Sequence, residues 1–401
     1  MKSYTKNFMI TRFREYYQDN LLKVPPSLSS REWGFLTFGD EKGMRRHRSF
    51  LSETELMTYI RNIVPAHIYH SAAYYQRPSA PIMKEKIWKG ADLIFDLDAD
   101  HLMKVPNSYN EMLSLVKKET FKLITFLTSD FGFDEKSINL VFSGGRGYHI
   151  HIRHPSILNL ESDERREIVD YITGRGLDIE NFIYPARLKG DCGSKSVSGL
   201  RVRPVGSPGW GHRINSSLEN LVVFLRGLDE DDAIKLLCQT KGIGEKGAIK
   251  FYKILLSENI IEDIHQGNLD SFKGSNAIWS KLLKDYLNQS GVELARSFEK
   301  ERGKTDEPVT SDVKRLIRCP GSLHGGSGLK VTPLSIQDFE EFEPLWDAVV
   351  FGDDSISIEI TKPFIAELRG QSYRMSPGIT EVPLYAAVFL MARGAAELSD
   401  T

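Results

Sequence analysis

Two aspartates separated by a single leucine carry the clearest chemical signal: Asp96-Leu97-Asp98 ends the apolar segment 91–98. In a strand, residues two apart point to the same face, so these carboxylates would lie side by side. Like charges that close favour a bound cation, and carboxylate oxygens suit Mg²⁺ or Mn²⁺. The alternative is a pair of aspartates that ends the strand in solvent. Asp100 continues the alternation but falls past the predicted strand.

A second candidate group follows in the segment Ser143-Gly-Gly-Arg146-Gly-Tyr-His149. Glycines allow backbone amides to approach an anion closely, while Ser143, Arg146 and His149 offer a hydroxyl, a guanidinium and an imidazole. These groups suit a polyphosphate. The alternative is an ordinary hairpin loop with no ligand.

A third group spans residues 306–330, where Arg318, His324 and Lys330 surround another glycine-rich turn. A site for two metal ions needs a third carboxylate, and Asp306 or Asp312 could supply it if several strands converge there. The spacing does not choose between them. The alternative is that the charges of this segment form surface ion pairs of little energetic value.

These groups need a scaffold, and the hydrophobic pattern predicts one with both helices and strands. Short apolar runs predict strands at 91–98 and 138–142, and apolar residues at helical spacing predict a helix at 108–129 between them. Ser108 and Glu111 have the spacing of a capping box at its start. We therefore expect a β-α-β core, with strands returning at 314–319 and 328–334.

Changes in composition and hydrophobic pattern along the chain predict three segments: a first part of the core at 1–160, a mainly helical insertion at 161–300, and a second part of the core at 301–401. Within the insertion, Gly242-Ile-Gly-Glu-Lys-Gly247 matches G-x-G-x-x-G. This match lies between helical segments and follows no predicted strand, so it fails the context that dinucleotide binding requires.

The composition is that of a folded globular protein: 401 residues, 41% hydrophobic and 26% charged, with net charge −2. A nucleic acid would therefore be bound by local basic patches such as Arg45, Arg46 and Arg48. Three scattered cysteines form no C-x-x-C pair. Without a signal peptide or an apolar run of about 20 residues, we expect a cytoplasmic protein that enters no membrane.

The three groups, in this order, resemble the catalytic small subunit of archaeal and eukaryotic DNA primases. The resemblance is carried by Asp96-x-Asp98, by Ser143-Gly-Gly-Arg-Gly-x-His149, and by Leu316-Ile-Arg-Cys-Pro-Gly-Ser-Leu-His324. It extends along the chain, because segments 31–35, 46–50, 73–75 and 383–396 also look like archaeal primase sequences.

The resemblance implies the primase catalytic fold, an α/β fold of mixed α+β type with central sheets flanked by helices, plus the helical insertion. It implies that Asp96, Asp98 and Asp306 are catalytic and hold two Mg²⁺ or Mn²⁺ ions. Asp306 is selected because the family's third aspartate stands eighteen residues before the motif histidine, here His324. The resemblance also implies that the following residues contact the nucleotide: Ser143, Arg146, His149, Arg318, His324, Arg46 and Lys330.

The implied activity is template-directed synthesis of short RNA primers, and possibly DNA primers, on single-stranded DNA from nucleoside triphosphates, leaving an RNA–DNA hybrid. The implied partner is a primase large subunit in a heterodimer, and that subunit would carry an iron–sulfur cluster. Many family members have a zinc knuckle after the D-x-D strand, but residues 100–121 contain only His101 and no cysteine, so no structural zinc is expected. The alternatives are a stand-alone primase-polymerase and a non-catalytic nucleic-acid-binding subunit.

Overall fold

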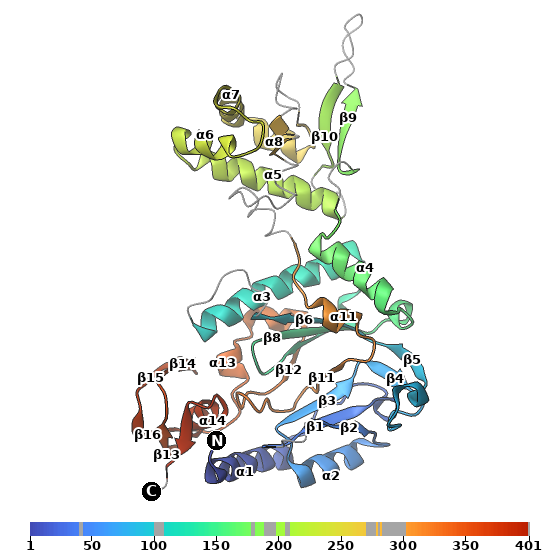
Figure 1. Cartoon of the computed structure of the whole chain (residues 1–401), viewed down its shortest axis with the longest axis vertical. Helices are drawn as coiled ribbons and strands as arrows, with labels where there is room; N and C mark the ends of the chain where they lie inside the picture. The colour runs from blue at the N-terminus through green and yellow to red at the C-terminus, as the bar shows by residue number, and fades with distance from the viewer. Residues whose placement is uncertain are drawn as a thin grey trace, which may run out of the picture. The chain divides into compact units, whose positions relative to one another are not determined.

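The computed structural model describes residues 1–39, 43–99, 108–177, 181–187, 198–204, 209–269, 278–279, 281–282 and 302–399. Helices and antiparallel sheets alternate along the chain, which confirms the predicted mixed α/β class (Figure 1). In the described part of the chain, no helix has both the length and the apolar character needed to cross a bilayer.

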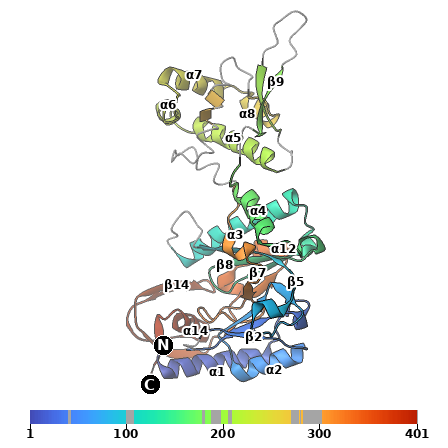
Figure 2. The ribbon, with the colours of Figure 1, turned by 45° about the vertical axis from the view of Figure 1, so that its right-hand side comes forward.

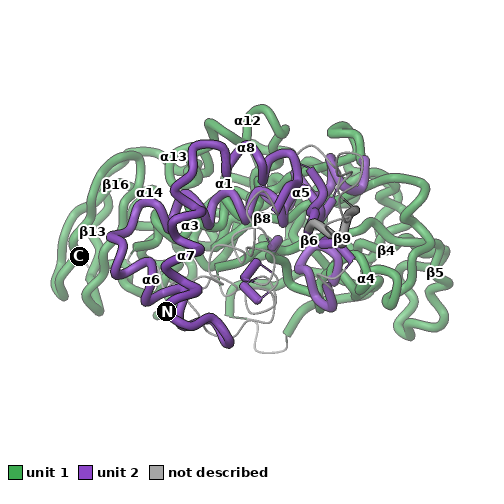
Figure 3. Tube along the Cα trace, turned by 90° about the horizontal axis from the view of Figure 1, so that it is seen from above, with its two compact units in different colours: residues 1–121, 133–169, 304–401 green, residues 122–132, 170–303 purple. Residues whose placement is uncertain are grey.

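The chain divides into two compact units (Figure 3). Unit 1 consists of residues 1–121, 133–169 and 304–401, and unit 2 of residues 122–132 and 170–303. The sequence reasoning set the insertion at 161–300 and did not associate residues 122–132 with it. Two helices, α3 (Tyr109–Thr125) and α4 (Ser162–Thr173), contribute residues to both units.

The first sheet of unit 1 has the strand order β11-β3-β1-β2, and each strand is antiparallel to its neighbour. Helices α1 and α2 cover its outer side (Figures 1 and 2). The bounds are β1 Trp33–Leu36, β2 Arg45–Arg48, β3 His67–Ser71, β11 Leu316–Arg318, α1 Ser3–Asp19 and α2 Glu53–Ile63. Strand β11 therefore brings the third sequence group beside β3, about 245 residues earlier in the chain.

The second sheet has the order β12-β7-β8-β6, again with antiparallel neighbours. Its strands are β6 Leu93–Asp98, β7 Ile138–Phe142, β8 Gly147–Ile152 and β12 Thr332–Leu334. Because β8 pairs antiparallel with both β6 and β7, these two are parallel and α3 connects them. The predicted β-α-β unit is thus present, with β8 inserted between its two strands.

Two predicted elements are interrupted in the structure, and the strands expected at 314–319 and 328–334 are shorter, at 316–318 and 332–334. The strand expected at 91–98 is interrupted: Ala91 ends β5 (Trp88–Ala91), and β6 begins at Leu93. The reason is Asp92, whose backbone N–H donates to Ala72 O (3.0 Å) and whose carboxylate pairs with buried Arg31. The helix predicted to reach 129 changes at Thr125 into a π-helical turn, Phe126–Asp130.

The inner faces of the two sheets meet around buried residues from distant segments. Ala72, Ile94, Val309 and Ile317 form one apolar cluster there. The outer face of the second sheet packs against α3 and α12 (Ile336–Glu341) through Tyr148, whose ring centroid lies 5.0 Å from that of Phe339. The sheets are therefore fixed against one another next to the D-x-D strand.

The C-terminal segment completes unit 1. Strand β13 pairs with β16 and β17, strand β14 pairs with β15, and the apolar helix α14 is buried over Leu384 to Met391. The remaining bounds in unit 1 are β4 Ala73–Tyr75, α11 Glu307–Ser311, α13 Pro344–Asp347, β13 Ser355–Ile360, β14 Phe364–Leu368, β15 Gln371–Met375, β16 Gly378–Pro383, α14 Leu384–Ala392, β17 Ala396–Leu398, and the 3₁₀ turns Leu28–Ser30, Met83–Lys86, Glu135–Ser137 and Pro155–Ile157.

Unit 2 is mainly helical in its described part. It contains α5 Trp210–Arg226, α6 Glu230–Cys238, α7 Glu245–Leu255, α8 Ile260–His265, and the antiparallel pair β9 Ile183–Arg187 and β10 Ser198–Val202. Asp130, from the segment 122–132, forms a buried ion pair with Arg213 of α5 (3.2 Å). The guanidinium of Arg213 also lies over the ring of Phe126, which fixes that segment to unit 2.

Candidate active site

The two aspartates of the D-x-D pattern lie on β6, as predicted. Buried Phe95 and Leu97 alternate with Asp96 and Asp98, whose side chains are 22% and 30% exposed. Because this alternation follows the two-residue period of a strand, both carboxylates lie on one face. They stand at the end of the strand, where solvent can still reach them.

Asp306 lies next to this strand although it follows Asp96 by 210 positions in the sequence. Its backbone N–H donates to Asp96 O (3.0 Å), and the hydroxyl of Thr305 donates to the same oxygen (3.3 Å). Asp306 occupies the N-cap position of α11, yet its carboxylate makes no capping hydrogen bond among the described residues. Asp312, the other candidate, stands at the opposite end of α11 and accepts from Lys314 N (2.9 Å) in a local turn.

Two nitrogen-bearing side chains face the carboxylates. Arg146 Nε lies 3.4 Å from Asp98 Oδ1, and His149 Nε2 lies 3.4 Å from Asp96 Oδ1. Burial, followed by the charge of Arg318, lowers the pKa of His149 to about 3, so its ring is neutral at pH 7. The contact with Asp96 is therefore not an ion pair at that pH.

The three aspartates share a region without forming a closed coordination shell. Within the residues that the structure describes, no three His, Cys, Asp or Glu side chains are gathered as a metal-binding cluster. The donor set nevertheless fits a hard divalent cation, because Asp96 and Asp98 present carboxylate oxygens on one partly exposed strand face. Asp100 and His101 lie outside the described residues.

The glycine-rich turn at 143–146 joins β7 to β8, as the sequence predicts. The hydroxyl oxygen of Ser143 accepts from the N–H of Gly145 (3.3 Å) and of Gly147 (3.4 Å). Gly144 has φ +72°, which favours glycine. The hydroxyl thus organises the turn, and contact between Ser143 and a nucleotide stays a prediction.

His324 packs directly onto this turn. A Cβ on Gly144 would lie only 2.7 Å from His324 Cβ, and the hydroxyl of Ser327 donates to Gly144 O. Lys330 belongs to the same loop: it bridges to Leu323 in the backbone, and its N–H donates to Ala348 O (2.9 Å). The second and third sequence groups are thereby brought into contact.

Arg318 lies on β11 and is held by two residues that the sequence reasoning missed. One of its guanidinium nitrogens lies 2.8 Å from His67 Nδ1 and 3.0 Å from the hydroxyl of Tyr69. The ring of His67 also packs edge-on against His324, with 4.8 Å between centroids. The signal was present in the sequence, because His67 and Tyr69 alternate in the short strand β3 and therefore share a face.

Burial keeps His67 and His324 neutral at pH 7. Desolvation, followed by the nearby charge of Arg318, lowers the pKa of His67 to about 3. The same two causes place the pKa of His324 well below its usual value. Arg318 therefore contributes positive charge to this part of the site at pH 7, while the imidazoles can act as neutral hydrogen-bonding groups.

Arg46 is bound elsewhere. It lies on β2, at the opposite edge of the first sheet from β11, and its guanidinium contacts both carboxylate oxygens of buried Glu32 (3.1 and 3.4 Å). Glu32 also contacts buried Lys86 (3.4 Å). The structure therefore does not group Arg46 with His149 of β8 and His324, and its proposed contact with a nucleotide stays a prediction.

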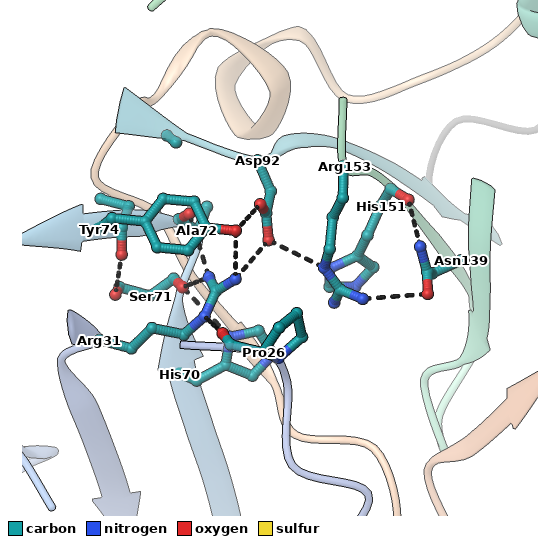
Figure 4. Close-up of polar contacts among 12 residues, drawn as sticks. Pro26, Arg31, His70, Ser71, Ala72, Tyr74, Asp92, Asn139, His151 and Arg153 are labelled. Carbon is teal, nitrogen blue, oxygen red and sulfur yellow. Dashed lines mark hydrogen bonds and ion pairs between the residues drawn. The ribbon is translucent and has the colours of Figure 1, made fainter. Parts of the chain in front are cut away.

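A buried polar network fixes the beginning of β6 (Figure 4). Arg31 and Asp92 form an ion pair at 2.9 Å with neither side chain exposed, and the hydroxyl of Tyr74 donates to Asp92 (2.5 Å). Arg153 contacts Asp92 from the other side (3.3 Å). Arg31 makes five hydrogen bonds, accepted by Pro26 O, Ser71 O, Ala72 O, Tyr74 Oη and Asp92 Oδ2. This network anchors the strand that carries the catalytic candidates.

Comparison with known proteins assigns the chain to a family. The family model described as "DNA primase small subunit" matches residues 95–336. The chain is 54% identical to a protein named DNA primase small subunit PriS of Methanothrix thermoacetophila, over 99% of this chain and 100% of that protein. Proteins of the same name from Methanococcoides burtonii and Methanosarcina barkeri are 46% and 44% identical, covering at least 97% of either chain. This chain belongs to the DNA primase small subunit family.

Proposed function

We propose that this chain is the subunit of a DNA primase that joins nucleotides into short RNA primers, and possibly DNA primers, on a single-stranded DNA template. Membership of the family supports a primase catalytic subunit. The observation that carries the finer proposal is the hydrogen bond from Asp306 N to Asp96 O, which brings the third aspartate to the D-x-D strand (3.0 Å). The two phosphate-binding candidates, the turns at 143–146 and 321–330, pack together beside it.

Asp96, Asp98 and Asp306 would hold two Mg²⁺ or Mn²⁺ ions. When bound, such ions make a hydroxyl more acidic and neutralise charge on the attacking and leaving oxygens of a phosphoryl transfer. The carboxylates of this chain position them, and the partly exposed face of β6 leaves access for a nucleotide. Pyrophosphate is the product that leaves when the α-phosphate of a nucleoside triphosphate is attacked.

The remaining residues would bind and orient the triphosphate. Arg146 and Arg318 supply fixed positive charges, and Lys330 adds another on the loop of His324. The neutral imidazoles of His149 and His324 can donate one hydrogen bond each without adding charge. Positioning and charge neutralisation together account for most of the rate in reactions of this type.

The proposed assembly is a heterodimer with a primase large subunit. The name "small subunit" of the relatives implies such a partner, and their similarity to this chain continues over almost its whole length. Isolation of the native complex tests this part: a stand-alone primase-polymerase would be recovered without a large subunit.

Four single-residue variants test the catalytic proposal: Asp96→Asn, Asp98→Asn, Asp306→Asn and, as matched control, Asp312→Asn. Each removes one negative charge, and the last two lie at opposite ends of the same short helix. Primer synthesis on single-stranded DNA with Mg²⁺ or Mn²⁺ should fall about 10³-fold in the first three, corresponding to several kcal/mol of metal-ion stabilisation. The control should keep wild-type activity. Wild-type product from Asp96→Asn and Asp306→Asn would refute the metal site.

A further inference from the structure

The G-x-G-x-x-G match that failed the dinucleotide test forms a defined structure in unit 2. Gly242 and Gly244 lie in the turn between α6 and α7, so the match follows a helix and opens another. Ile243, only 6% exposed, anchors this turn. One face of α7 is also buried, and its Phe251 packs edge-on against Trp279, with 4.9 Å between ring centroids. The turn is therefore held on a packed base.

The opposite face of α7 is basic. Lys246, Lys250 and Lys253 are exposed and stand at positions i, i+4 and i+7, which places them in one row along the helix. Lys241 precedes the turn, and exposed Lys281 donates to Gly242 O (2.7 Å), so both belong to the same surface. Residues 239–257 contain a single acid, Glu245. We call these five lysines and the turn the α7 surface.

The turn of the α7 surface also presents backbone donors. Gly244 is the N-cap of α7 and has no side chain that could cap this end of the helix. Its φ of −90° suits any residue, and a Cβ at this position would meet no described atom within 4 Å. Neither conformation nor packing thus requires glycine at 244. A side chain there would only stand between the first amides of the helix and an approaching ligand.

We propose that the α7 surface binds the sugar–phosphate backbone of duplex nucleic acid. A row of lysines beside open helix amides matches a chain of phosphates in charge and in hydrogen-bonding type. The two aromatic residues of α7, Phe251 and Tyr252, are buried, so the α7 surface lacks the stacking platform that single-strand binders use. This binding site lies in unit 2 and does not depend on the proposed chemistry of unit 1.

The first test measures salt dependence with the full chain. The association constant K for a fluorescein-labelled DNA duplex of 16 base pairs is measured at several salt concentrations. For the triple variant Lys246→Ala/Lys250→Ala/Lys253→Ala, the slope of log K against log [salt] should be shallower than that of the wild type by about 2.7. Alanine preserves the helix. The matched control is Lys235→Ala on α6, where the lysine already pairs with Asp232 (3.1 Å), and its slope should stay that of the wild type. An unchanged slope in the triple variant would overturn the proposal.

The second test separates binding from folding. Gly244→Asp introduces a better N-cap residue, so the thermal midpoint should not fall, but its charge would cover the amides and repel phosphate. We expect at least tenfold weaker duplex binding. Wild-type affinity of Gly244→Asp for the duplex would contradict a duplex-backbone site. So would a loss of affinity, in Gly244→Asp or in the triple lysine variant, that is confined to a single-stranded 16-mer. Duplex binding is measured without nucleotide or metal ion and primer synthesis in a separate assay, so failure of the catalytic proposal and failure of this one give different results.

Discussion

The substitution Arg31→Met should destabilise unit 1 strongly, although residue 31 is not among the candidate catalytic residues. The guanidinium of Arg31 and the carboxylate of Asp92 are both fully buried. Without Arg31, the partners of the Asp92 carboxylate among the described residues are Tyr74 and the partly exposed Arg153. Breaking one side of a buried ion pair costs about 3–5 kcal/mol, because the remaining charge stays buried without its partner. Three backbone carbonyls lose a donor at the same time.

The magnitude can be checked by a double-mutant cycle. The double variant Arg31→Met/Asp92→Asn leaves neither buried charge without its partner. Its loss of unfolding free energy should therefore be smaller, by at least about 1 kcal/mol, than the sum of the losses of the two single variants. The partly exposed pair of Arg12 with Glu15, whose side chains are 27% and 48% exposed, offers a control: Arg12→Met should change the free energy of unfolding by about 1 kcal/mol or less.

Urea unfolding followed by pulsed hydrogen exchange and mass spectrometry would report the two units separately. Peptides that cover β3 and β6 should lose protection at lower urea in Arg31→Met, while those from α5 and α7 should keep the wild-type midpoint. A loss below about 1 kcal/mol in unit 1, or strictly additive single variants, would show that the pair is not the anchor of β6 that its geometry indicates.

Two more predictions concern the site itself. Burial lowers the pKa of His67 to about 3, so below pH 6.5 the unfolded chain binds a proton that the native chain does not. The free energy of unfolding should therefore fall on acidification from pH 7 to 5.5, and His67 should account for about 1 kcal/mol of that fall. His67→Gln should flatten the measured dependence of unfolding free energy on pH, and an unaltered dependence would argue for a charged ring. Gly144→Ala should cost about 1–2 kcal/mol in backbone strain and push His324 away, raising the KM for nucleotide. Gly352→Ala, where a Cβ meets no described atom, is its control, and equal KM values in the two variants would contradict the packing of His324 on the turn.

Local patterns in the sequence predicted the parts of the site that depend on short-range geometry. The alternation of Asp96 with Leu97 and Asp98 predicted a shared strand face, and the glycines after Phe142 predicted a turn between two strands; both are confirmed. Asp92 could not be recognised as the end of a strand pairing, because its partner Arg31 lies 61 residues earlier and only the folded chain brings them together.

Spacing alone also left Asp306 and Asp312 as equal candidates for the third carboxylate. Their difference arises from the docking of α11: its first end is hydrogen-bonded to β6, whereas Asp312 is used in the turn that leads to β11. A pattern of residue types does not encode which end of a five-residue helix meets a strand more than 200 positions away. The packing of Val309 with Ile94 and Ile317, together with the hydrogen bond from Asp306 N to Asp96 O, holds the helix in this orientation.

Arg318 and Arg46 were both predicted to contact the nucleotide, but the folded chain gives their guanidinium groups different partners. Arg318 lies on β11, directly beside His67 and Tyr69, and points to the region where the two glycine-rich turns meet. Arg46 lies on the far edge strand, where the buried carboxylate of Glu32 holds its guanidinium with two hydrogen bonds. A nucleotide phosphate would have to compete with that carboxylate for the same donors, whereas Arg318 is held by the hydroxyl of Tyr69 and by the imidazole of His67, which is neutral at pH 7. Arg318 can therefore direct its full positive charge at a triphosphate, and its replacement should affect nucleotide binding more than that of Arg46.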